Sequence, residues 1–86
     1  MNQLILGDSL MYSLQQVEIS KITIGKRFRK DLGNIKELAQ SIDLVGLLQP
    51  IGITKQYKLE FGQRRLEAVK SLGLTTISAL IWEDKN

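Results

Sequence analysis

The chain has 86 residues, of which 43% are hydrophobic and 24% are charged, a composition typical of one small folded domain and not of a disordered segment. It contains no cysteine and no histidine, which excludes disulfides, thiol chemistry and histidine-based catalysis or metal binding within these residues. The formal net charge of +3 permits an anionic partner but does not by itself identify one.

The first sixteen residues, MNQLILGDSLMYSLQQ, carry a single charged side chain. They lack a basic leader, and Gly7 and Asp8 interrupt the apolar run, so the segment does not fit a signal peptide. No apolar run reaches the ~20 residues that cross a bilayer. We therefore expect a cytoplasmic protein with no membrane partner. Residues 1–16 form an N-terminal arm or short extra element, packed on the domain or on a second copy, and residues 17–86 form the domain.

The segment NIKELAQSIDLVG, residues 34–46, predicts a helix. Asn34 is a good N-cap and Glu37 follows three residues later, as in a capping box. Gly46 ends the pattern. One face of this helix is apolar and carries Ile35, Leu38, Ala39, Ile42 and Val45.

The remaining segments alternate between strand and helix patterns. We expect a strand at 17–23, a loop at 24–33, short strands at 51–54 and 57–61, a helix at 63–72 and a closing strand at 75–83. This order lacks the regular alternation of a doubly wound sheet. It predicts the α+β class, as a single small domain with a mixed sheet of about four strands packed by two to three helices.

The stretch FGQRRL places Arg64 and Arg65 in the first turn of the second helix, where the helix dipole is already positive. Unpaired N–H groups at a helix start bind anions, and arginine adds forked donors suited to phosphate. Arg65 also shares its helical face with apolar residues. Because an unpaired charge on a buried face is costly, we expect an anion or a carboxylate opposite the Arg65 guanidinium. The alternative is a structural role through ion pairs of Arg64 with Glu67 and of Arg65 with Glu60. Spacing alone does not decide between the two.

A second basic cluster, KITIGKRFRK at residues 21–30, has five lysines or arginines and no acid. Such a block is either a solvated face or a surface that contacts nucleic-acid phosphates. Phosphate is the common partner that both basic clusters would share.

Two longer stretches resemble a known family. LAQSIDLVGLLQPIGI resembles the first conserved box of the ParB N-terminal domain, and FGQRRLEAVKSLGL resembles its second box, G-x-x-R-x-x-A, carried here by Gly62, Arg65 and Ala68. The spacing between the boxes also matches, and the likeness runs from about Val17 to Trp82. The family, also called ParB/sulfiredoxin-like, implies a small α+β domain that binds a nucleotide.

The resemblance implies roles for particular residues. Phosphate would be bound by Arg29 before the first helix, by Gln49 of LLQP and by the second box, residues Gly62, Gln63, Arg64 and Arg65. Apart from the resemblance, the basic cluster at residues 21–30 predicts that Lys26, Arg27 and Lys30 contact DNA phosphates. Position 63 is Gln where ParB boxes usually have Glu, which puts nucleotide turnover in doubt. No catalytic residue is predicted, and the metal ligands stay unknown.

The resemblance also implies ligands and partners. ParB proteins bind CTP with magnesium and act on DNA in partition, so we expect CTP, magnesium and sequence-independent contacts with DNA. A homodimer, a partner protein and a missing C-terminal DNA-binding domain are further expectations. The alternative class is enzymatic, a phosphotransferase, a nuclease or a weak nucleotide triphosphatase, and a third is an interaction domain without nucleotide. Without a cysteine the sulfiredoxin activity is excluded, and without histidine or a dense carboxylate cluster binding is favoured over hydrolysis.

Overall fold

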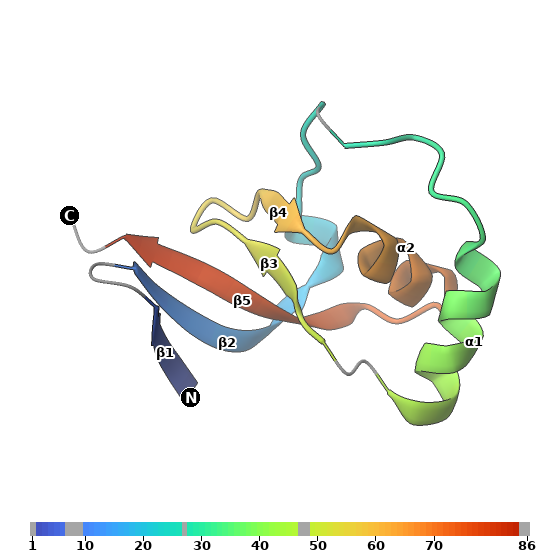
Figure 1. The fold of residues 1–86 in the computed structure, drawn as a ribbon, viewed down its shortest axis with the longest axis horizontal. Helices are drawn as coiled ribbons and strands as arrows, with labels where there is room; N and C mark the ends of the chain where they lie inside the picture. The colour runs from blue at the N-terminus through green and yellow to red at the C-terminus, as the bar shows by residue number, and fades with distance from the viewer. Residues whose placement is uncertain (1, 7–9, 27, 47–48, 85–86) are drawn as a thin grey trace.

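The structure, a computed structural model, describes residues 2–6, 10–26, 28–46 and 49–84. The elements in chain order are β1 (Asn2–Leu6), β2 (Leu10–Glu18), the 3-10 helix η1 (Ile19–Lys21), α1 (Ile35–Val45), β3 (Ile51–Ile53), β4 (Leu59–Phe61), α2 (Gln63–Ser71) and β5 (Thr76–Asp84). Figure 1 shows α1 and α2 side by side at one end of the molecule, while the β1–β2 hairpin and the end of β5 extend from the other.

One sheet runs through the whole domain in the order β1-β2-β5-β3-β4. β3 lies parallel to β5, whereas β2 is antiparallel to β5 and to β1, so the sheet is mixed. This arrangement confirms the α+β class and the mixed sheet with two packed helices. The strand beyond the expected four is β1, because residues 2–6 of the segment expected to be an arm pair with β2. The boundary proposed at residue 17 stays a prediction.

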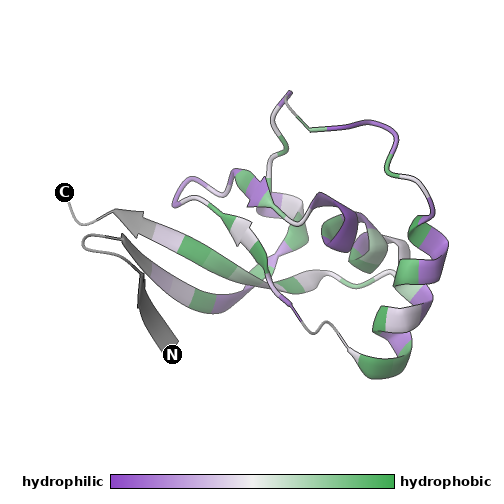
Figure 2. Cartoon of the chain, viewed as in Figure 1, coloured by the Kyte–Doolittle hydropathy of each residue, from purple (hydrophilic) through white to green (hydrophobic). Residues whose placement is uncertain are grey.

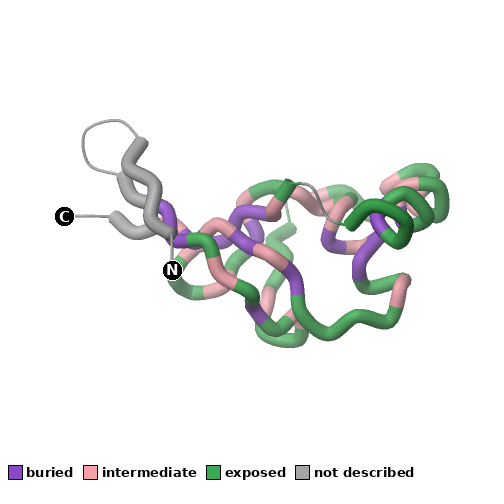
Figure 3. Tube along the Cα trace, turned by 90° about the horizontal axis from the view of Figure 1, so that it is seen from below, coloured by how far each residue is buried: buried purple, intermediate pink, exposed green. Residues whose placement is uncertain are grey.

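The core lies between the two helices and the centre of the sheet. Its buried apolar residues include Ile42, Ile51, Ile53, Leu59, Leu66, Ala68, Val69, Ile77, Ala79 and Ile81. Ile42 and Val69, which the helical patterns place in the core, are 8% and 1% exposed. Figure 2 shows hydrophobic residues along the middle of β5, and Figure 3 shows buried residues concentrated on the central strands. The burial of Ile42 and Val69 confirms them as core residues. α2 packs on β3, whereas the apolar face of α1 packs mainly on α2 instead of on the sheet, and Val45 at the end of that face is 61% exposed.

The helix α1 begins and ends where its sequence signals predict. The side chain of Asn34 accepts a hydrogen bond from the backbone N–H of Glu37 at 3.2 Å. The Glu37 carboxylate contacts the side-chain amide of Asn34 at 3.4 Å, in place of the backbone N–H of a standard capping box. Gly46 follows the last helical residue with φ +86°, a conformation that favours glycine.

The strand expected at 17–23 is wrong in its boundaries. The observed strand β2 starts earlier, at Leu10, and ends at Glu18, which pairs with Thr76 at the start of β5. Beyond that pair β5 offers no further partner, so the chain leaves the sheet in η1, and Ile19 donates to the carbonyl of Thr75 at 2.9 Å. Thr23 returns only as a single bridge to Lys58. Among the described residues, no helix is long and apolar enough to cross a membrane.

Candidate functional site

A cleft of about 540 Å³ opens where β4 ends and α2 begins. Its walls come from the segment before α1, from α1, from the segment before β3 and from the start of α2. The lining residues are Phe28, Arg29, Leu32, Leu38, Gln49, Glu60, Phe61, Gly62, Gln63, Arg64 and Arg65. The structure thus brings together all six residues that the sequence assigned to phosphate binding.

Gly62 stands at the N-cap of α2 with φ +94°, in the left-handed region. A Cβ at this position would lie 2.9 Å from the Cγ2 atom of Ile51, so glycine is required for α2 to approach β3. Because glycine has no side chain to cap the first turn, and that turn contains no acid, N–H groups at the start of α2 are available to an anion.

Gln63 uses its side-chain amide to bind the backbone of Arg29. The Nε2 group of Gln63 donates to the carbonyl oxygen of Arg29 at 2.6 Å. The Oε1 atom of Gln63 accepts from the N–H of Arg29 at 3.2 Å. Both backbone groups of one residue are therefore paired with both polar groups of one side chain.

Arg64 binds backbone carbonyl groups on the same segment. Its Nε atom donates to the carbonyl of Leu32 at 3.0 Å, and its Nη2 atom donates to the carbonyl of Asn34 at 3.1 Å. Glu67, the acid considered as its ion-pair partner, lies 3.6 Å from Lys70 instead. Arg64 therefore links the start of α2 to the start of α1.

Arg65 turns to the opposite wall of the cleft. Its Nη1 atom donates to the side-chain oxygen of Gln49 at 2.7 Å, so the two residues predicted to bind phosphate are neighbours. Arg65 is half-buried and Gln49 is exposed. The amide oxygen carries no charge, so this hydrogen bond does not neutralise the guanidinium. Glu60 is the one acid among the described residues that line the cleft, and its ion pair with Arg65 stays a prediction.

The other predicted cations lie along the segment that leads to α1. Lys26, Arg29 and Lys30 are exposed, and Arg29 also lines the cleft. Arg27 lies outside the described residues. No group of three metal-binding side chains occurs in the parts of the chain that the structure describes.

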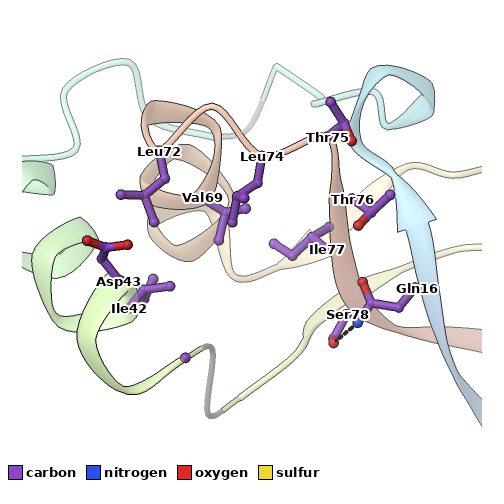
Figure 4. Close-up of a pocket in the computed structure, with 11 residues that line it drawn as sticks. Gln16, Ile42, Asp43, Val69, Leu72, Leu74, Thr75, Thr76, Ile77 and Ser78 are labelled. Carbon is purple, nitrogen blue, oxygen red and sulfur yellow. Dashed lines mark hydrogen bonds between the residues drawn. The ribbon is translucent and has the colours of Figure 1, made fainter.

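A second cleft of about 500 Å³ lies between α1, the end of α2 and the start of β5. Its wall is partly apolar and partly polar. Figure 4 shows Val69, Leu72 and Leu74 in the apolar part, and the hydrogen bond between Gln16 and Ser78 at one side. Asp43 is the only charged residue among the described residues that line it. No lysine or arginine is among the described residues that line this cleft, and none of the six residues assigned to phosphate binding lines it, so it is not the site that the sequence predicts.

The contacts that Gln63 and Arg64 make with residues 29–34 were not predicted from the sequence. They join residues 30 to 34 positions apart and involve backbone atoms of the partner, which carry no residue-specific pattern. The one indirect signal for these contacts in the sequence was Gln63 itself, because ParB boxes usually have Glu at this position.

Fold and site together define a small α+β domain with a cationic cleft at a helix N-terminus. The sequence profile of the ParB N-terminal domain family matches residues 7–86. The chain therefore belongs to the ParB N-terminal domain family.

Two curated relatives are similar in sequence. The probable chromosome-partitioning protein ParB of Campylobacter jejuni is 38% identical over 78 residues, which is 87% of this chain and 27% of that protein. The nucleoid occlusion protein of Oceanobacillus iheyensis is 46% identical over 52 residues, which is 55% of this chain and 18% of that protein. The chain thus spans less than a third of the length of these relatives.

Solved structures share the fold. The pNOB8-like ParB N-domain has a TM-score of 0.75 at 23% identity, over 88% of this chain and 31% of that one. Sulfiredoxin from Arabidopsis thaliana has a TM-score of 0.72 at 34% identity, over 80% of this chain and 83% of that one. The ParB of Caulobacter crescentus, complexed with CTP-gamma-S, has a TM-score of 0.68 at 24% identity, over 80% of this chain and 43% of that one.

Proposed function

We propose that this chain is a nucleotide-binding, DNA-associated module with a role in partition or its regulation, and that the cleft at the start of α2 holds the nucleotide phosphates. Arg29, Gln49, Gly62, Gln63, Arg64 and Arg65 are the residues proposed to form the site. The observation that carries the proposal is their convergence on one cleft at the N-terminus of a helix whose first turn contains no acid. That arrangement combines backbone N–H groups with guanidinium donors, which is the chemistry of phosphate binding.

CTP is the nucleotide we favour, because the structurally similar Caulobacter crescentus ParB is complexed with CTP-gamma-S. Magnesium fits this cleft as a companion of the phosphate groups. The described residues supply no cluster of carboxylates for it, so most of its oxygen ligands would come from phosphate and water, as magnesium prefers.

The DNA contacts belong to the same proposal. Lys26 and Lys30 are exposed on the segment before α1, and Arg27 lies between them in the sequence. We propose that these cations bind DNA phosphates without reading the sequence. By analogy with the ParB family, a cytoplasmic location, a homodimer, and a partner protein or a further C-terminal DNA-binding domain complete the proposal. The chain matches less than a third of the length of its curated relatives.

Isothermal titration calorimetry tests the function directly. The chain is titrated with CTP, ATP, GTP, the matching diphosphates and cytidine, each with and without magnesium. We expect CTP to bind more tightly than the other nucleotides, the triphosphates to bind more tightly than the diphosphates, and cytidine to bind weakest. Absence of heat with every nucleotide, or an affinity independent of the number of phosphates, would contradict a phosphate-binding cleft.

A further inference from the structure

Residues 29–34, RKDLGN, form one wall of the cleft, and we call this segment the strap. Figure 1 shows it running past the start of α2 before the chain enters α1. Hydrogen bonds within and beside the strap are local, from the N–H of Gly33 to the Asp31 carboxylate and from the N–H of Ile35 to the carbonyl of Gly33. Asn34, the last residue of the strap, caps α1 through hydrogen bonds with Glu37. The described hydrogen bonds of the strap to any further element come from the first two residues of α2.

These two residues hold the strap at both ends. The Gln63 amide pairs with the N–H and carbonyl of Arg29 at the beginning of the strap. The Arg64 guanidinium donates to carbonyl groups of Leu32 and Asn34 at its end. Every partner atom on the strap is a backbone atom, so these contacts set the course of the chain and leave the strap side chains free to act.

We propose that Gln63 and Arg64 are positioning residues that fix the strap beside the phosphate cleft, and that phosphate itself is bound chiefly by Arg65, Arg29 and the N–H groups of α2. This inference deepens the proposed function and rests on it for the role of the cleft. Two of the three guanidinium nitrogens of Arg64 already donate to the strap, whereas the described hydrogen bond of Arg65 goes to a neutral amide that a phosphate can replace.

The pairing requires an amide at position 63. In the wild type, Nε2 of Gln63 donates to the carbonyl oxygen of Arg29 at 2.6 Å. A glutamate carboxylate has no donor, so its oxygen in place of Nε2 would repel that carbonyl oxygen. A protonated carboxyl, in contrast, has one O–H donor and one carbonyl acceptor, the same two groups as the amide. Gln63→Glu should therefore break the pairing at neutral pH and restore it when the introduced carboxyl is protonated.

The first experiment measures the strap without any nucleotide. NMR follows the carbonyl carbon shift of Arg29, which responds to the hydrogen bond at its oxygen, as a function of pH. In Gln63→Glu we expect the shift to leave its wild-type value at pH 7 and to return to it below about pH 4, near the ordinary pKa of glutamate. Asp31 in the strap and Glu60 in the cleft are present in every variant. The wild type and Gln40→Glu, a matched change on the exposed face of α1, therefore give the baseline curve, from which only Gln63→Glu should depart at pH 7.

A second variant removes both hydrogen bonds while keeping an unbranched side chain. In Gln63→Met we expect amide hydrogen exchange of Arg29 to accelerate about twofold to tenfold, the effect of losing one hydrogen bond, at every pH. Exchange at Leu66, whose N–H bonds to the carbonyl of Gly62 inside α2, should not change. Unaltered exchange at Arg29, or a Gln63→Glu shift that does not return at low pH, would overturn the positioning role.

The link to the cleft is tested by CTP titration of the same proteins at pH 7. We expect Gln63→Glu to lower CTP affinity about threefold to tenfold, a smaller effect than the loss of a direct charge-assisted hydrogen bond to phosphate. The CTP affinity of Gln40→Glu should equal that of the wild type. Arg64→Lys should weaken binding and speed exchange at Arg29 and Ile35 together, because one ammonium cannot reach both carbonyls. Failure of the wild-type chain to bind CTP would refute the proposed function, whereas the nucleotide-free NMR data decide the positioning role independently.

Discussion

Arg64 and Arg65 are adjacent in the sequence, yet their guanidinium groups donate to different walls of the cleft. Arg65 is half-buried and its described partner is the amide oxygen of Gln49. Removing its side chain should therefore weaken phosphate binding more than it lowers the stability of the fold. We expect Arg65→Ala to lower nucleotide affinity by ~1.5–3 kcal/mol, or about tenfold to a hundredfold, as measured by calorimetry.

Melting temperatures separate this effect from loss of structure. Loss of the bond to Gln49 is offset in part by relief of cation repulsion at the helix start, so Tm should change by no more than ~4–8 °C, the equivalent of about 1 kcal/mol. Arg65→Lys should recover only part of the affinity because it lacks the fork. Lys36→Ala, which removes one exposed charge from α1, is the control and should bind normally. Normal binding by Arg65→Ala, or its unfolding, would show that the arginine is structural.

The two helices are stabilised mainly where their apolar faces meet. Val69 on α2 and Ile42 on α1 are almost fully buried, and each truncation leaves a cavity that the sheet cannot fill. Ile42→Ala and Val69→Ala should each lower the free energy of unfolding by ~1–4 kcal/mol in urea titrations. Leu44, on α1 and 85% exposed, is the matched control, and its change to Ala should stay within about 0.5 kcal/mol. Equal effects at Ile42 and Leu44 would contradict this description of the core.

Element by element, the sequence predicts the helices better than the strands. Asn34 and Gly46 mark the ends of α1 through local backbone chemistry, and apolar spacing indicates α2, so both helices lie where expected. The extent of β2 depends instead on where its partner β5 begins, a contact between residues about 60 positions apart that no local pattern reveals. The same limit applies to the cleft, whose six residues were identified by resemblance, while the pairing of Gln63 with Arg29 depends on tertiary contacts.

At the scale of the whole molecule, charge governs the expected contact with DNA. The net charge is +3, and three described cations, Lys26, Arg29 and Lys30, are exposed on one segment. Three to four phosphate contacts predict that affinity falls roughly 40- to 150-fold between 50 and 200 mM salt. Fluorescence anisotropy with two unrelated duplexes should give the same affinity for both, because contacts to phosphate carry no sequence information.

Paired substitutions test whether this surface and not net charge alone binds DNA. The double change Lys26→Ala with Lys30→Ala should weaken binding to both duplexes. It should also reduce the slope of log affinity against log salt concentration by the amount expected for about two phosphate contacts. The double change Lys36→Ala with Lys70→Ala removes the same charge from exposed positions on α1 and α2, and it should have a smaller effect. Equal losses in both double variants would mean that the whole molecular charge attracts DNA. A strong preference of the wild-type chain for one duplex would require base contacts, and it would overturn a purely phosphate-directed interface.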